Sequence, residues 1–123
     1  MNIDELRERC LSVKGASESL PFDENTLVYK VMGKMFAYFS LFPKDGEFFV
    51  NMKCHPEKSA DLMARYAGVT FGYHSDKKYW ISVFIRSDVP DALIAELIAH
   101  SVDEVIKKLP KSRQQAYLTL NEE

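Results

Sequence analysis

The sequence predicts an α+β fold, a two-layer sandwich in which an antiparallel sheet carries its helices on one side. Three patterns lead to this prediction. An apolar stripe at helical spacing runs from Pro90 to Leu109, which is typical of a long amphipathic helix. Residues 78–86 alternate along a strand whose two faces both carry apolar groups, as in the centre of a sheet. Residues 26–31 and 34–41 flank a glycine-containing two-residue turn and so predict a hairpin.

The chain begins with a predicted helix over residues 3–13. Asn2 and Glu5 occupy the positions of a capping box, and Gly15 suits the end of the helix. Cys10 falls on its apolar face, so we expect a packed thiol there. Residues 15–25 are polar and contain proline, and we expect them to form a loop.

Beyond the hairpin, the alternation of residues 47–53 predicts a strand that is half exposed to water. Pro56 suits the first turn of a helix that reaches Tyr66, with a narrow inward stripe of small and apolar residues. That stripe comprises Ala60, Met63, Ala64 and Ala67. A short strand over 69–72 and a turn over 73–77 precede the strand 78–86, and residues 112–120 suit a last short helix. The predicted order is therefore α-β(3)-α-β(2)-α, followed by that short helix.

Length and composition favour one domain that spans residues 1–123, with 46% hydrophobic and 28% charged residues. No apolar run approaches the roughly 20 residues of a membrane-spanning helix, and the first residues lack the zones of a signal peptide. We therefore expect a cytoplasmic protein without membrane contact. In that compartment Cys10 and Cys54 are expected to be reduced thiols.

Charge is segregated along the chain although the net charge is only −2. Residues 26–86 hold nine basic and five acidic side chains, a local charge of +4, whereas the segments on either side each carry −3. Because salt screens charges beyond roughly 8 Å, a local basic patch attracts phosphates even on an acidic protein. The alternative interpretation is that these lysines only solvate one face of the sheet.

Metal binding and catalysis receive little support from the sequence. His55 adjoins Cys54, but ligand pairs at zinc spacing are not repeated elsewhere, so we predict no metal site and no cofactor. His55 is better explained as a residue of the strand-to-helix junction. Without a nucleophile elbow or a glycine-rich phosphate loop, the chain is not expected to be an enzyme.

Several sequence landmarks extend over residues 2 to about 118, nearly the whole chain. They include Leu20-Pro21-Phe22, Lys53-Cys54-His55-Pro56-Glu57, Gly72-Tyr73-His74 with Lys77 and Trp80, and Lys108-Leu109-Pro110-Lys111. Together they resemble the MmcQ/YjbR family of small bacterial proteins, which is often described as having a double-wing DNA-binding motif. The resemblance implies a fold similar to secretion-chaperone-like and CyaY-like folds. The chain departs from the expected pattern at Phe71, where we expect proline, and at Tyr79, where we expect histidine.

The turn from Gly72 to Trp80 is the candidate contact surface, because ammonium, imidazole and aromatic groups crowd into it. The hairpin tip supplies a second basic group of residues. The predicted nucleic-acid-binding residues are Lys30, Lys34, Lys53, His74, Lys77 and Lys78. A lone tryptophan at a strand start is more often a core residue, and we expect this of Trp80.

Two other functions remain open. One is a protein-interaction module that resembles secretion chaperones and uses Phe49 and neighbouring aromatic side chains to hold a partner. The other is a small-molecule site lined by Tyr73, His74 and Cys54. DNA binding, if present, is expected to be weak, with nonspecific dissociation constants of roughly 10⁻⁴ to 10⁻⁶ M.

Overall fold

A six-stranded antiparallel sheet organises the computed structural model, which describes residues 1–72 and 76–120. The strands lie side by side in the order β1-β2-β3-β4-β6-β5. Their bounds are Ser17–Ser19 (β1), Thr26–Val31 (β2), Lys34–Ser40 (β3), Phe49–Lys53 (β4), Val69–Phe71 (β5) and Trp80–Phe84 (β6). The helices are Ile3–Leu11 (α1), Pro56–Arg65 (α2), Asp91–Ile106 (α3) and Lys111–Leu118 (α4). The predicted α+β class with an antiparallel sheet is confirmed.

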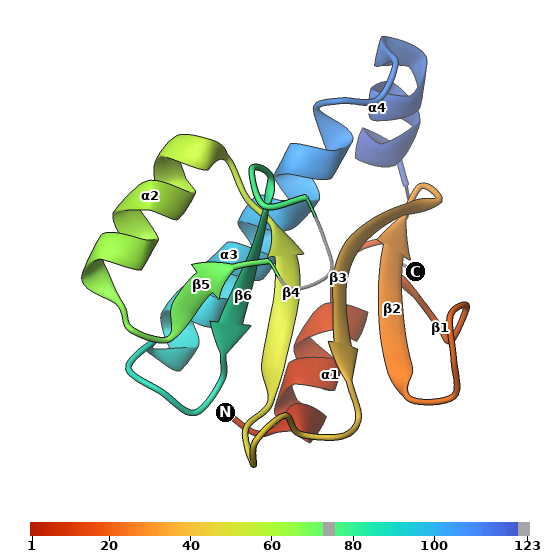
Figure 1. Ribbon diagram of the computed structural model, residues 1–123. Coiled ribbons are helices and arrows are strands. Elements are labelled where there is room, and N and C mark those ends of the chain that lie inside the picture. The colour runs from red at the N-terminus through yellow and green to blue at the C-terminus, as the bar shows by residue number, and fades with distance from the viewer. Residues whose placement is uncertain (73–75, 121–123) are drawn as a thin grey trace.

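Helices α1 and α3 cover one face of the sheet, and both lie behind the strands in Figure 1. Helix α3 contacts β2, β3 and β4, and α2 contacts the edge strand β5. The two sides of the sheet therefore differ in character. The side chains beneath α1 and α3 form the core, whereas the opposite face, turned to the viewer, is the open face of the sheet.

The hairpin between β2 and β3 has the predicted two-residue turn. Met32 and Gly33 both have positive φ, 50° and 77°, as a tight turn between twisted antiparallel strands requires. Further along, Tyr29 pairs with Ala37 but Lys30 pairs with Met35, so that Phe36 is an extra residue in β3. This β-bulge brings Phe36 into the core, where its side chain is fully buried.

A serine of α3 fills the gap that follows this bulge. The β3–β4 ladder ends at the pair Ala37–Met52. Beyond it, the buried Ser101 hydroxyl donates to the Phe36 carbonyl at 2.5 Å and accepts from the Lys53 amide at 2.9 Å. The hydroxyl thus takes the place of a missing strand pair and fixes α3 against β3 and β4.

Strand β1 lies inside the segment that we predicted to be a loop, and for these three residues the prediction was wrong. Ser17 pairs with Lys30 and Ser19 with Val28. Between them, Glu18 binds Arg7 through two contacts of 2.7 Å and accepts the hydroxyl of Tyr29 at 2.7 Å. A three-residue polar strand carries no alternation of its own. The tertiary contacts of its one carboxylate specify it.

Acid should weaken this contact. The Arg7 guanidinium, with help from the Tyr29 hydroxyl, holds the pKa of Glu18 below its ordinary value of 4.5. A carboxyl whose pKa is lower in the folded state stabilises the fold above its unfolded pKa, and the contribution disappears as the pH falls through the folded pKa. We therefore expect the melting temperature to drop below about pH 4.5 and the Glu18→Gln variant to drop less steeply. Thermal unfolding from pH 7 to pH 3, with the exposed Glu96→Gln as control, measures this. Parallel profiles for wild type and Glu18→Gln would contradict it.

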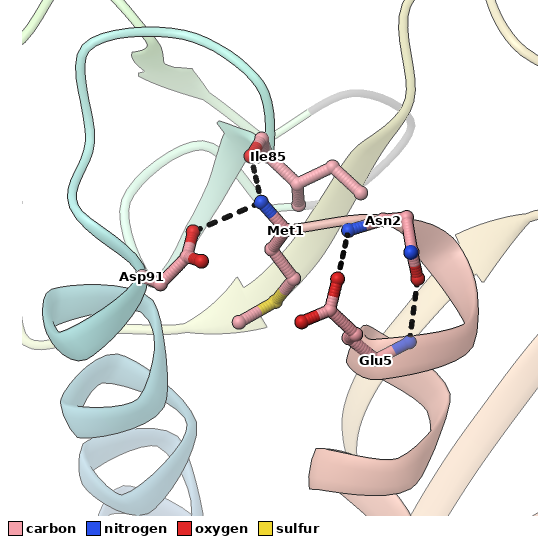
Figure 2. Close-up of polar contacts among 5 residues, drawn as sticks. All are labelled: Met1, Asn2, Glu5, Ile85 and Asp91. Carbon is pink, nitrogen blue, oxygen red and sulfur yellow. Dashed lines mark hydrogen bonds and ion pairs between the residues drawn. The ribbon is translucent and has the colours of Figure 1, made fainter.

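The start of α1 has the predicted capping box, and Figure 2 shows it. The Asn2 side chain accepts the Glu5 amide at 2.8 Å, and the Glu5 carboxylate accepts the Asn2 amide at 3.2 Å. The amino group of Met1 donates to Asp91 at 3.0 Å and to the Ile85 carbonyl at 3.5 Å (Figure 2). These contacts join the N-terminus, just before α1, to the end of β6 and the beginning of α3.

The inward face of α2 differs from the predicted stripe. Ser59 and Leu62 are buried, whereas Ala60, Ala64 and Ala67 are exposed and Met63 is half-buried. The prediction followed the small residues, but the larger Leu62 joins the core. Burial favours the side chain that removes more apolar area from water. The remaining elements begin and end within a few residues of the predicted bounds.

Candidate nucleic-acid interface

The candidate interface lies at the end of the sheet where the β2–β3 hairpin, the end of β4 and the start of β6 meet. Tyr79, just before β6, is its centre. The ammonium of Lys108 lies 4.4 Å from the centroid of the Tyr79 ring, and that of Lys78 lies 5.4 Å from it. Two cations thus flank one aromatic ring, a contact that an electron-rich ring face favours.

Two further lysines belong to this group. Burial lowers the pKa of Lys53, and repulsion from the ammonium groups of Lys108 and Lys34 lowers it further. Lys53 also pairs with Trp80 across β4 and β6, and the Cys54 amide donates to the Tyr79 carbonyl at 2.8 Å. We name this group the lysine cluster; it comprises Lys34, Lys53, Lys78 and Lys108.

Carboxylates lie near the lysine cluster but do not balance it. Glu104 and Asp76 act on Lys53 in the direction that raises its pKa. Glu104 is mostly buried and forms an ion pair of 2.5 Å with Lys107, so this lysine already offsets its charge. At the hairpin tip, Arg113 of α4 donates to the Met32 carbonyl at 2.7 Å and adds another cation to this end of the molecule.

The structure brings together three of the six residues that the sequence predicted. Lys34, Lys53 and Lys78 belong to the lysine cluster, Lys77 is exposed beside Lys78, and Lys30 is half-buried in β2 opposite Met35. His74, together with Tyr73 of the small-molecule alternative, lies outside the described residues.

Lys108 and Tyr79 were missed. In the sequence, Lys108 stands out only as part of the family landmark Lys108-Leu109-Pro110-Lys111, and Tyr79 only as a departure from the expected histidine. The missed signal was the pair Lys107-Lys108 at the very end of the apolar stripe, just before Pro110. Lys107 is the C-cap residue of α3 and Lys108 follows it, so both cations lie just beyond the negative end of the helix dipole.

His55 has the junction role that we predicted for it. Its Nδ1 accepts the Glu57 amide at 3.2 Å and so caps α2, while its own amide donates to Nε2 of His100 at 3.2 Å. Burial lowers the pKa of His100, in keeping with an imidazole that accepts a hydrogen bond. Within residues 1–72 and 76–120, no three His, Cys, Asp or Glu side chains are grouped so as to hold a metal ion.

Both cysteines are buried thiols, as expected for Cys10. Burial raises the pKa of Cys10 to about 12, and burial also raises the pKa of Cys54. Since the thiolate is the reactive form, neither residue suits a nucleophilic role near neutral pH.

The open face of the sheet carries an aromatic pocket of about 440 Å³. Tyr38 and Trp80 form part of its lining, with ring centroids 5.7 Å apart and planes inclined by 54°. The expectation that Trp80 belongs to the core was wrong, because the residue is only half-buried and faces this pocket. A strand residue that faces away from the helices is covered only by its neighbours in the sheet. The sequence alone did not specify which face of β6 is turned away from the helices.

The comparison with known proteins identifies the relatives of this chain. A family model described as YjbR matches residues 11–103. The uncharacterized protein YbdF of Escherichia coli O157:H7 is 36% identical over 95 residues, which cover 77% of this chain and 76% of that protein. The uncharacterized protein YjbR of Escherichia coli K12 is 26% identical over 120 residues, which cover 98% and 100%.

Solved structures agree with the fold. The crystal structure of Deinococcus radiodurans protein DR2400, described as a DUF419 domain, superposes with a TM-score of 0.83 at 31% identity, covering 94% of this chain and 87% of that one. A Pseudomonas syringae protein superposes with a TM-score of 0.71 at 19% identity, covering 82% and 96%, and shows the fold alone. No helix in the described part of the chain is long and apolar enough to cross a membrane.

Proposed function

Since this chain belongs to the YjbR family, we propose that it is a cytoplasmic DNA-binding protein whose lysine cluster contacts phosphates, without a catalytic step. The observation that carries the proposal is a group of four lysines from four separate parts of the chain, in which Lys78 and Lys108 lie over the Tyr79 ring and Lys34 and Lys108 repel Lys53. Ammonium groups that repel one another are stabilised by an anion placed between them. A phosphate at this position therefore relieves the repulsion that acts on Lys53.

The number of cations sets the strength of binding. Each neutralised phosphate contributes about −0.9 to the log-log salt slope, so that four lysines give a slope of about −3.6. The nearby carboxylates Asp76 and Glu104 reduce the local field. We accordingly expect weak, sequence-tolerant binding, with dissociation constants of roughly 10⁻⁴ to 10⁻⁶ M at physiological salt.

Charge reversal at the ring-bound lysines tests the proposal. The double variant Lys78→Glu/Lys108→Glu is expected to weaken binding to a labelled 20-base-pair duplex by at least about tenfold and to flatten the salt slope by about 2. Fluorescence anisotropy titrations between 50 and 200 mM salt measure both quantities.

A matched control separates a local interface from net charge. The double variant Arg65→Glu/Arg86→Glu makes the same change in charge at two exposed positions outside the lysine cluster, one in the last turn of α2 and one just beyond the end of β6. We expect it to retain most of the affinity. An equal loss in both double variants, or no binding by the wild type at 50 mM salt, would rule out the lysine cluster as the interface.

The second candidate is a protein-interaction module, and the open face of the sheet favours it. Phe49 and Phe84 pair across β4 and β6, and both side chains are half-buried. The centroids of their rings lie 5.4 Å apart on this face. Aromatic side chains at a surface are frequent anchors in protein interfaces. A pull-down after nuclease treatment distinguishes the two functions, because a protein that remains bound is not bridged by nucleic acid.

A further inference from the structure

The aromatic pocket on the open face is walled by rings and edged by negative charge. Trp80 and Tyr38 supply the inclined rings, and Phe22 and Met35 complete the apolar lining. Phe22 lies on the segment between β1 and β2 and is 66% exposed. The volume of the aromatic pocket, about 440 Å³, falls within the range of sites that hold small organic ligands.

Every charged side chain that lines this pocket in the described part of the chain is a carboxylate. Asp23 accepts the Asn25 amide at 2.8 Å and the Thr26 hydroxyl at 3.2 Å, and the first of these bonds is the main reason that its pKa is lowered. Asp76, on the other side, accepts the Lys78 amide at 2.8 Å. Both carboxylates are thus held in place by local hydrogen bonds.

We propose that this pocket binds a small organic cation, such as an alkylammonium or guanidinium compound. The faces of tryptophan and tyrosine rings attract cations, and two carboxylates add to that attraction. A small metal ion does not fit this lining, because it needs oxygen ligands in place of its water, whereas rings and a thioether supply hydrocarbon surface. A phosphate or carboxylate ligand would face the repulsion of Asp23 and of Asp76, although Lys53 offsets part of the charge of Asp76. An organic cation satisfies both the apolar walls and the negative edge.

The chain carries its own reporter of this site. Trp80 is its single tryptophan, so tryptophan fluorescence reports on the pocket alone. Purified protein, free of nucleic acid, is titrated with choline and agmatine as the cationic probes and with 3,3-dimethyl-1-butanol as the neutral isostere of choline. We expect a saturable change with at least one cation, and binding of the neutral alcohol at least about tenfold weaker than that of choline when choline binds.

Two charge-neutralising variants locate the binding. Asp76→Asn and, independently, Asp23→Asn keep the shape of the side chain and are expected to weaken cation binding by about five- to tenfold. Asp61→Asn, which removes an exposed carboxylate from α2, is the matched control and should bind as the wild type does. Melting curves of each variant show whether it is folded, and the two aspartate variants serve as alternatives if one is not.

Three results would overturn the proposal. They are a flat titration with both cations, equal affinity for choline and its neutral isostere, and unchanged cation binding in folded Asp76→Asn and Asp23→Asn. Because no nucleic acid is present, none of them bears on the DNA-binding function of the lysine cluster.

Discussion

Phe36→Ala is expected to destabilise the protein by about 3–5 kcal/mol, the usual cost of removing a fully buried aromatic ring. The Phe36 side chain has no exposed surface, and its ring centroid lies 6.3 Å from that of Tyr29. Phe36 is the extra residue of a β-bulge, and β3 pairs with β2 both before it and after it. The backbone around Phe36 therefore cannot move easily to close the cavity. The free energy of unfolding of a small domain is only about 5–15 kcal/mol in total, so this loss is large.

Urea unfolding followed by circular dichroism measures the effect. Leu118→Ala is the control, because its side chain is 67% exposed and its truncation should cost less than about 0.5 kcal/mol. A loss below about 1 kcal/mol for Phe36→Ala would mean that this part of the core is loosely packed.

The second large effect is expected at Ser101. Ser101→Ala removes a hydroxyl that serves the Phe36 carbonyl and the Lys53 amide at once. A buried polar group that loses its partner costs about 1–3 kcal/mol, so we expect a total loss of about 2–3 kcal/mol. Ser112→Ala, an exposed serine of α4, is the matched control and should stay within about 0.5 kcal/mol of the wild type.

Amide hydrogen exchange gives this prediction a local readout. The Lys53 amide should exchange faster in Ser101→Ala, whereas the amide of Cys54, which donates to the Tyr79 carbonyl, is the internal reference. Equal protection of the Lys53 amide in both proteins would show that another acceptor replaces the hydroxyl. In that case the link between α3 and the sheet does not depend on Ser101.

The Ser101→Ala variant also bears on the interface. Lys53 follows the ladder that Ser101 completes, and Lys108 lies just beyond the end of the helix that Ser101 fixes. If Ser101→Ala loosens α3, the lysine cluster should lose its arrangement, and DNA binding should weaken although no lysine has changed.

The local patterns of the sequence were sufficient for most of the fold. The capping box at Asn2, the Met32-Gly33 turn and the apolar stripe of α3 are each specified by residues close together in the chain. Such signals are physical constraints on a short stretch of backbone, so they survive in any tertiary context. They predicted the α+β class, and the capped start of α1 followed from the same rules.

Other features depended on residues that are distant in sequence. Strand β1 exists because Glu18 meets Arg7 and Tyr29, and the lysine cluster exists because the end of α3 reaches the start of β6. The sequence alone also could not reveal that Trp80 faces a pocket, since the alternation of β6 is apolar on both faces.

By itself, then, the sequence determined every element except β1, their order and the basic character of the middle of the chain. Only the tertiary structure decided which cations share one site and which carboxylates edge the aromatic pocket. The physical reason is range: backbone preferences act over a few residues, whereas charge and ring contacts act over a few ångströms between groups that the fold brings together from distant parts of the chain.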